Sequence, residues 1–485
     1  MAMTLERTIR NAVTGGVLKV AAFNRKRLKA PAGGHPYLTG IHRPMDEELT
    51  LEALEVDGSI PQALDGRYLR IGPNPVTAPD PGSYHWFAGD GMVHGLRLKD
   101  GAAHWYRNRW VRSNAVSDSL GEPRKPGDRN PRTDTVNTNI VAMGGRTIAL
   151  VEAGGKPVEM DAELHTVRHD PLDGMTKGFS AHPHRDPSNG EMHAICYEAT
   201  IPDRVWHKVV DAQGRVIREE PVPVRDGPSI HDCQITRNYV LIMDLPATFS
   251  LKRLMAGYAF PYDWNPGHGA RVGLMPRRGT ADDIMWCELE EPCYVYHPAN
   301  AFEDEDGTVI MDVVVHQSTY EESPHGPGGR WARFERWSMS PAGGPVMRRI
   351  LDDRAQEFPR YDERRSCQPY RYAYTMELGT DESGAFVATG QRLFKHDLET
   401  GDRQARDFGA GRHPGEFVFV PRDPDTTDSL AEDDGWLVGL VVDGTAGTTE
   451  LHILNADDFE GPSQAVIYLP HRIPPGFHGN WIPTA

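Results

Sequence analysis

Short apolar runs alternate with turn residues along almost the whole chain after Pro36. Typical runs are Thr308–Val315 and Gly435–Val442, which are rich in β-branched and other apolar residues. The dipeptides that punctuate the pattern are Asp57-Gly58, Asp65-Gly66, Asp90-Gly91, Asp100-Gly101, Gly144-Gly145, Asn189-Gly190, Gln213-Gly214, Asp306-Gly307, Thr400-Gly401 and Asp434-Gly435. Because Gly, Asn and Asp tolerate positive φ, most of these dipeptides indicate hairpin turns between strands.

Many short strands over some 450 residues predict an all-β fold, which is a sandwich, an array of barrels or a propeller. The chain shows no exact internal repeat, and the Trp-Asp dipeptide of one common propeller repeat does not occur in it. The pattern favours a propeller, but it does not give the number of blades.

The first 30 residues differ from the rest, with seven basic residues against one acid, Glu6. Leu5, Ile9, Val13 and Val17 recur at every fourth position and would share one face of a helix, although the pair Gly15-Gly16 weakens this prediction. We therefore predict a basic, partly helical N-terminal extension over 1–35, followed by one catalytic β-propeller domain over 36–485. A basic amphipathic segment can lie on an anionic membrane, and a solvated tail packed on the body is the alternative.

The stretch 245–265 also breaks the strand pattern, because it has many apolar residues and few turn residues before Pro261. It predicts a loop packed on the body or, alternatively, a short apolar helix. If 249–260 forms an exposed apolar patch, it is a second candidate for peripheral contact with a membrane.

Composition narrows the choice of partners and compartment. The formal net charge of −17 argues against nucleic acid, which needs a basic face. The five cysteines are widely spaced without a Cys-x-x-Cys motif, so a disulfide framework or a zinc ribbon is not expected. No apolar run is long enough for a membrane span, and no secretory leader is recognisable. We expect a cytoplasmic protein. Peripheral contact with the inner face of the membrane is compatible with this location.

Four of the 21 histidines stand in distinctive surroundings: His182, His231, His297 and His478. Long stretches of chain separate them, and each alone is more often a core histidine than a ligand. On a propeller, however, the inner strands of separate blades converge on one axis, where four histidines could meet around one ion. Four neutral imidazoles suit iron, copper, nickel or zinc, and an open coordination position favours a redox ion that binds O2 over a closed structural zinc.

The surroundings of these histidines, taken in order with other stretches, resemble the carotenoid cleavage oxygenase family. The stretches that carry the resemblance are Gly66–Pro75, His85–Met92, Tyr106–Arg112, Asn137–Asn139, Ser180–Pro183, Ile230–Asp232, Tyr296–Glu303, Glu357–Arg360, Gly415–Pro421 and Gly476–Trp481. The similarity covers almost all of the chain from Pro36 onward. Among the members of the family, the motifs most resemble those of bacterial enzymes that act on carotenoids and apocarotenoids. One departure is Ile71, which stands where the family usually has Asn, and we expect little effect of it on the metal site.

The resemblance implies a seven-bladed β-propeller, capped by loops and short helices, with Fe(2+) on its axis. The residues that it implies as iron ligands are His182, His231, His297 and His478. It further implies that the carboxylates of Glu152, Glu357 and Glu416 orient three of these ligands, which agrees with the usual pairing of a ligating imidazole with a carboxylate. Thr138 matches a position near an open site on the iron, whereas His184 is interpreted as a bystander.

The implied activity is oxidative cleavage of a carbon–carbon double bond by O2, which gives two carbonyl products and needs no external reductant. The chain accordingly has no recognisable flavin, haem or nicotinamide motif. Members that cleave stilbenes have a Lys before the first glutamate and a Tyr in a nearby loop, whereas here Val151 precedes Glu152 and Lys125–Pro131 has no Tyr. We therefore expect an apolar polyene, a carotenoid or apocarotenoid, as substrate. Cleavage of stilbenes or other lignin-derived phenylpropenoids is the alternative activity. A non-catalytic carotenoid-binding propeller and a calcium-dependent propeller hydrolase are alternatives from other classes.

Overall fold

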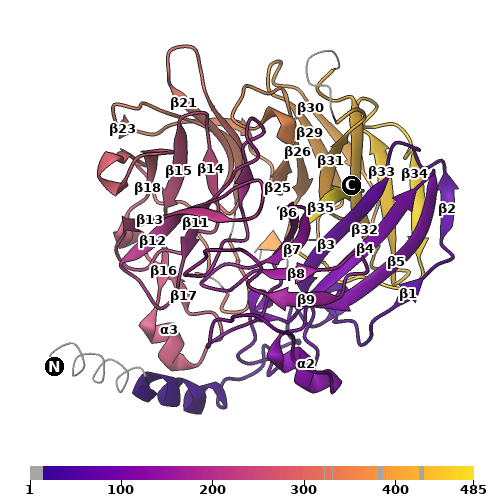
Figure 1. Ribbon diagram of the computed structural model, residues 1–485, viewed down its shortest axis with the longest axis horizontal. Coiled ribbons are helices and arrows are strands. Elements are labelled where there is room, and N and C mark those ends of the chain that lie inside the picture. The colour runs from indigo at the N-terminus through magenta and orange to yellow at the C-terminus, as the bar shows by residue number, and fades with distance from the viewer. Residues whose placement is uncertain are drawn as a thin grey trace.

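The structure is a computed structural model that describes residues 15–321, 323–329, 331–380, 386–387, 389–424 and 431–484. The predicted helix positions Leu5, Ile9 and Val13 lie outside these residues. Within them, seven sheets of four or five strands form the blades of a propeller, which confirms the predicted fold class (Figure 1).

Each blade is a largely antiparallel sheet, and one of its two edge strands lies nearest the axis of the propeller. The first three blades contain, from the axis outward, β6 (Asn139–Met143), β7 (Arg146–Leu150), β8 (Val158–Met160) and β9 (Thr166–His169); β10 (His184–Arg185), β11 (Met192–Tyr197), β12 (Arg204–Val210) and β13 (Val216–Pro223); and β14 (Cys233–Ile235), β15 (Tyr239–Asp244), β18 (Arg271–Pro276), β19 (Met285–Glu288) and β23 (Gly344–Pro345).

The next three blades follow in chain order. They contain β20 (Pro298–Glu303), β21 (Val309–His316), β22 (Ala332–Met339) and β24 (Met347–Asp352); β25 (Gln356–Arg360), β26 (Tyr372–Glu377), β29 (Arg392–Asp397) and β30 (Arg403–Asp407); and β31 (Arg412–Pro421), β32 (Gly435–Asp443), β33 (Thr448–Asn455), β34 (Ala465–Leu469) and β2 (Glu55–Gly58).

The seventh blade joins the two ends of the chain. It contains β35 (Gly479–Pro483), β3 (Gly66–Pro73), β4 (Gly91–Lys99), β5 (Ala102–Trp110) and β1 (Thr50–Leu51). The C-terminal strand β35 pairs with β3, in a register that sets Trp481 opposite Tyr68. Because an early strand and the last strand share one sheet, the ring of blades is closed by backbone hydrogen bonds.

Shorter elements lie outside the blades. They are the two-stranded sheets β16 (Ala247–Phe249) with β17 (Tyr262–Trp264) and β27 (Gly379–Thr380) with β28 (Phe386–Val387), the α-helices α2 (Asn114–Leu120), α3 (Leu251–Ala256) and 15–25, and the 3-10 turns η1 (Gly40–His42), η2 (Trp86–Ala88), η3 (Pro266–His268), η4 (Ala281–Asp283) and η5 (Glu363–Arg365).

The loop interpretation of the stretch around α3 is wrong, because Leu251–Ala256 is helical. The side chain of Ser250 accepts a hydrogen bond from the amide of Arg253 at the start of the helix, and Gly257 ends it in the left-handed region. The helical residues 15–25 include Gly15 and Gly16 and lie beside α3 (Figure 1). Among the described residues, no helix is both long and apolar enough to cross a membrane.

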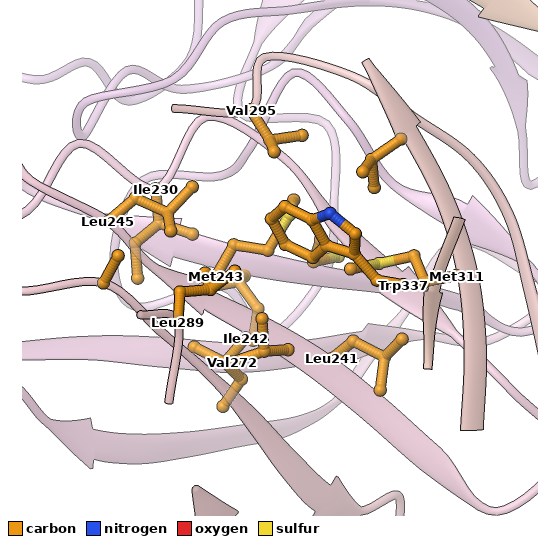
Figure 2. Packing of buried hydrophobic residues seen from close by; sticks show 14 of the residues in the cluster. Ile230, Leu241, Ile242, Met243, Leu245, Val272, Leu289, Val295, Met311 and Trp337 are labelled. Carbon is orange, nitrogen blue, oxygen red and sulfur yellow. The ribbon is translucent and has the colours of Figure 1, made fainter. Parts of the chain in front are cut away.

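The largest apolar core among the described residues spans the blades that begin with β10, β14 and β20. Trp337 of β22 is fully buried there, and Figure 2 shows its indole among Val295, Met311 and the aliphatic side chains of β15. The indole Nε1 donates to the carboxylate of Glu335 at 2.9 Å, which satisfies its only polar atom. This packing between blades holds the inner strands at fixed positions around the axis.

Candidate metal centre

His182, His231, His297 and His478 meet on the axis of the propeller, although they come from four different blades. All four are buried, and each offers one ring nitrogen to a group whose nitrogens all lie within 4.8 Å of one another. His297 and His478 directly precede the innermost strands β20 and β35, and the other two lie two residues before β10 and β14. The ends of the innermost strands therefore bring distant parts of the sequence to one point.

The remaining three innermost strands supply the neighbours of this group. Thr138 directly precedes β6, and Glu357 and Glu416 belong to β25 and β31. The pairing of β25 with β26 shifts register between Glu357 and Arg360, and that of β31 with β32 shifts between Pro414 and Phe417. Such bulges turn a side chain out of the regular alternation, and here they lie beside the two glutamates that face the axis.

Three carboxylates contact the outward-facing nitrogens of three of the histidines. His297 Nδ1 is 2.7 Å from Glu357, His478 Nδ1 is 3.0 Å from Glu416, and His231 Nδ1 is 3.0 Å from Glu152. A carboxylate can only accept, so each Nδ1 carries the proton and each Nε2 keeps its lone pair.

The inward-facing nitrogens are arranged for a cation. Nε2 of His231 and Nε2 of His297 are 3.2 Å apart, a distance at which two lone pairs repel unless a positive charge lies near them. His182 Nε2 is buried and has no hydrogen-bond partner within the described part of the chain. Such nitrogens normally have a partner when they are buried, so the group fits a divalent metal ion.

His182 differs from the other three, because none of the glutamates that the structure describes contacts it. Its Nδ1 lies 3.6 Å from Oδ2 of Asp232, the residue after His231. The other oxygen of Asp232 is 2.8 Å from Nε2 of His184. His184 thus lies outside the group of four, as expected, but it shares a carboxylate with one member of that group.

Burial and neighbouring charges shift the pKa values of His182, His478, His297 and Glu416. Burial lowers the pKa of His182 well below its ordinary value, and it also lowers that of His478 despite the nearby Glu416. Burial would raise the pKa of Glu416, but His478 and Arg360 hold this pKa at about 2. For His297, burial is outweighed by Glu357, which leaves the pKa of the imidazole raised.

Two residues beside the centre, His316 and Phe358, were not predicted from the sequence. His316, the last residue of β21, places Nε2 2.8 Å from the oxygen of Glu357 that His297 does not contact. Phe358 has a φ of 52° and stacks on His297, with ring centroids 5.0 Å apart. His316 could have been noticed, because it is a histidine at the end of an almost wholly apolar strand. The left-handed conformation of Phe358 leaves no signal in a single sequence.

An apolar cavity of about 310 Å³ opens beside the four histidines, and we call it the apolar cavity. Thr138 and Val151 lie in its wall, and so do Glu152 and three of the histidines, His231, His297 and His478. Aromatic side chains make up much of the remaining wall, and they include Trp86, Phe87, Phe260, Tyr296, Phe358 and Phe477. The arrangement places a candidate metal ion at the edge of a space suited to a hydrocarbon.

Thr138 and Ile71 are tied to His478 through the backbone. The amide of His478 donates to the carbonyl of Thr138 at 3.2 Å, and the amide of Ile71 donates to the carbonyl of His478 at 3.1 Å. The side chain of Ile71 is buried in an apolar cluster. The backbone hydrogen bonds beside His478 are therefore kept, although Ile71 stands where the family usually has Asn.

Comparison with known proteins decides the family. The sequence profile described as retinal pigment epithelial membrane protein matches residues 42–483. The carotenoid cleavage oxygenase of Mycobacterium tuberculosis is 40% identical over 94% of this chain and 99% of its own length. The chain belongs to the carotenoid cleavage oxygenase family. It is accordingly a member of a family of dioxygenases, and the predicted enzyme class is confirmed.

Solved structures of this carotenoid cleavage oxygenase family share the fold. The cobalt-substituted Synechocystis apocarotenoid oxygenase superposes with a TM-score of 0.79 and 28% identity, over 91% of this chain and 97% of that one. The lignostilbene dioxygenase of Pseudomonas brassicacearum gives a TM-score of 0.83 and 26% identity, over 94% and 100%. The family thus includes enzymes named for apocarotenoids and for lignostilbenes, and both share one architecture.

Proposed function

We propose that this oxygenase uses Fe(II) and O2 to cleave a carbon–carbon double bond of a carotenoid or apocarotenoid, giving two carbonyl products. His182, His231, His297 and His478 are the proposed iron ligands, and Glu152, Glu357 and Glu416 orient three of them. The observation that carries the proposal is the position of four buried imidazoles beside an apolar cavity. When bound, iron(II) supplies the binding and activation of O2.

The protein's own residues perform the remaining tasks. The aromatic wall of the apolar cavity binds the polyene and excludes water, so that one double bond is held beside the centre. The three glutamates fix the tautomer of their histidines through the Nδ1 contacts. Thr138 lies in the cavity wall together with His478, where its small side chain would shield an open position on the iron. Because one O2 takes up the four electrons released by cleavage of the double bond, no side chain needs to deliver a reducing equivalent.

The choice of a polyene over a stilbene is supported by the wall next to Glu152. Val151 lines the apolar cavity where stilbene-cleaving members have a Lys, and it presents only methyl groups. A phenolic oxygen placed there would lose hydrogen bonds to water without gaining a partner from this side chain. A hydrocarbon chain has no such requirement.

The test is reconstitution of the metal-free protein with Fe(II) under anaerobic conditions, followed by O2 and mass spectrometry of the products. We expect two carbonyl fragments from an apocarotenal and none from a hydroxystilbene. The variant His297→Ala should lose bound iron and turnover, whereas the control His165→Ala, at an exposed histidine, should retain both. If only the stilbene gives products, the proposed substrate class is wrong. An iron-bound protein that binds but never cleaves the polyene would be a carotenoid-binding propeller.

We also propose that the surface formed by helical residues 15–25 and α3 contacts a membrane. Asn24 and Arg25 donate to the carbonyls of Met255 and Gly257 at 2.7 and 3.0 Å, so the two helices form one surface. The exposed apolar side chains of these helices are Leu18, Val20, Phe23, Leu251 and Met255. Lys19 is an exposed basic side chain of the first helix, and Lys26, Arg27 and Lys29 directly follow it and are exposed as well. The chain then runs from α3 to Phe260 in the wall of the apolar cavity, which would place the substrate's route beside the lipid.

Co-sedimentation with vesicles of phosphatidylglycerol and phosphatidylcholine tests this contact. The double variant Phe23→Glu with Leu251→Glu should lose most of its binding. The control Met347→Glu changes a side chain that is 64% exposed at the rim of another blade, and it should bind like the parent protein. Equal binding by both variants would contradict the proposed surface.

A further inference from the structure

A second cavity reaches the four histidines, and it differs in character from the apolar one. Its volume is about 530 Å³, and its wall includes His182, His297 and His478. Polar and charged side chains, rather than aromatic rings, make up much of the remaining wall: His184, Arg185, Asp232, Arg360, Glu363 and Asn480. We call it the polar cavity.

The order of residues along the innermost strands places the two cavities at opposite ends of the centre. Thr138 lines the apolar cavity, and the next residue, Asn139, lines the polar one. In the same way, His231 lines the apolar cavity and Asp232 lines the polar one. Because these chain segments lead from the centre into the innermost strands, the polar cavity lies between those strands.

A second group of possible metal donors lies next to His182, and two of its members, His184 and Asp232, line the polar cavity. His184, Asp232 and Cys233 offer ring nitrogen, carboxylate oxygen and sulfur atoms within 4.8 Å of one another. The His184 side chain is 17% exposed and Asp232 is 4% exposed, and Oδ2 of Asp232 lies 3.6 Å from Nδ1 of His182. The donors thus form a series from the partly exposed His184, through Asp232, to the buried group.

A hydrated divalent ion faces unequal conditions in the two cavities. Moving a bare or partly hydrated cation past aromatic side chains loses hydration without replacement, and this is strongly unfavourable. A carboxylate and an imidazole can replace water ligands one at a time. The apolar cavity, moreover, is the space that a bound polyene would fill.

From these observations we propose that the polar cavity is the route by which the metal ion reaches the four histidines, and that His184 with Asp232 binds the ion on the way. The inference rests on the proposed metal centre. In this proposal His184 binds the metal ion during its entry, although it is not one of the four final ligands. The proposal also means that the ion can enter or leave while the apolar cavity holds substrate.

The experiment follows the binding of Co²⁺ to the metal-free protein by the visible absorption of the ion in stopped flow. In His184→Ala we expect loading to be about tenfold slower, at the lower end of the rate gains that charged clefts give. The final occupancy should stay at one ion per chain. The control His165→Ala removes a similar pair, 3.3 Å from Asp161 on the outer surface, and should load at the parent rate.

A second comparison separates the two routes directly. Ala142→Trp introduces bulk into the wall of the polar cavity and should slow both loading and chelator-driven loss of Co²⁺. An apocarotenal bound anaerobically in the apolar cavity should leave both rates unchanged. If the apocarotenal slows loading while His184→Ala and Ala142→Trp do not, the ion enters through the apolar cavity and the inference is overturned.

The same data distinguish failure of the route from failure of the metal centre. If the parent protein shows no stoichiometric Co²⁺ absorption, the proposed four-histidine centre is wrong. If it binds Co²⁺ and every variant loads at the parent rate, the centre stands and only the route is wrong.

Discussion

His316 Nε2 lies 2.8 Å from Oε1 of Glu357, while Oε2 of the same carboxylate lies 2.7 Å from Nδ1 of His297. Glu357 is therefore held by two imidazoles, only one of which belongs to the group of four. The second contact fixes the rotation of the carboxylate and so the direction in which it holds the His297 ring. His316 is a positioning residue for the proposed centre.

The variant His316→Ala should weaken metal binding less than Glu357→Gln does. Loss of the carboxylate itself should lower the affinity by about 10- to 100-fold, the range seen for partners of metal-bound histidines, and loss of His316 by a smaller factor. Competition of the protein with a chelator for Co²⁺ measures both, and the Co²⁺ absorption bands should shift in His316→Ala. The control His452→Ala breaks a buried contact to Glu450 on an outer strand and should leave affinity and spectrum unchanged. An unshifted spectrum in His316→Ala would contradict the positioning role.

Val151→Lys should reduce kcat/KM for an apocarotenal by about tenfold, or about 1.4 kcal/mol, because an ammonium group keeps water in the apolar wall where the polyene would lie. The matched variant Val151→Leu keeps the wall apolar and should retain most of the activity. Steady-state assays of both variants on one substrate check this expectation. An unchanged kcat/KM in the Lys variant would mean that the substrate does not contact this wall.

Glu416 should make the metal-free protein sensitive to acid. Its pKa in the folded protein is about 2, below the ordinary value of 4.5, so its contribution to stability is complete above pH 4.5 and is lost as the pH falls toward 2. The contribution is at most roughly 3 kcal/mol for a shift of this size. In urea denaturation, Glu416→Gln should be less stable than the parent at pH 7, and the gap should narrow toward pH 3. The control Glu305→Gln, at an exposed position, should follow the parent at every pH, and a constant gap for Glu416→Gln would refute the expectation.

Trp337→Ala should lower the free energy of unfolding by about 3–5 kcal/mol, because it empties a fully buried site between two blades and leaves Glu335 without one of its donors. The midpoint of urea denaturation measures the change. The surface variant Met347→Ala serves as the control, since its side chain is mostly exposed. A loss below about 1 kcal/mol would show that the neighbouring side chains close the cavity.

Local sequence predicted the strands well, because alternation of apolar runs with Gly- and Asp-containing turns is a short-range property. It failed for Leu251–Ala256, where the apolar composition fitted a loop as well as a helix and the cap at Ser250 decided the outcome. It gave no sign of the left-handed Phe358 either, since that conformation is imposed by the bulge at the end of β25.

The sequence by itself determined an all-β chain with four histidines in distinctive surroundings and, through its motifs, the family to which it belongs. Only the tertiary structure decided that these histidines face one point, that His316 shares Glu357, and that Asp232 lies between His182 and His184. The physical reason is that a propeller brings the starts of its innermost strands together by packing between blades and by pairing β35 with β3. Those contacts join residues far apart in the chain, and no local pattern encodes them.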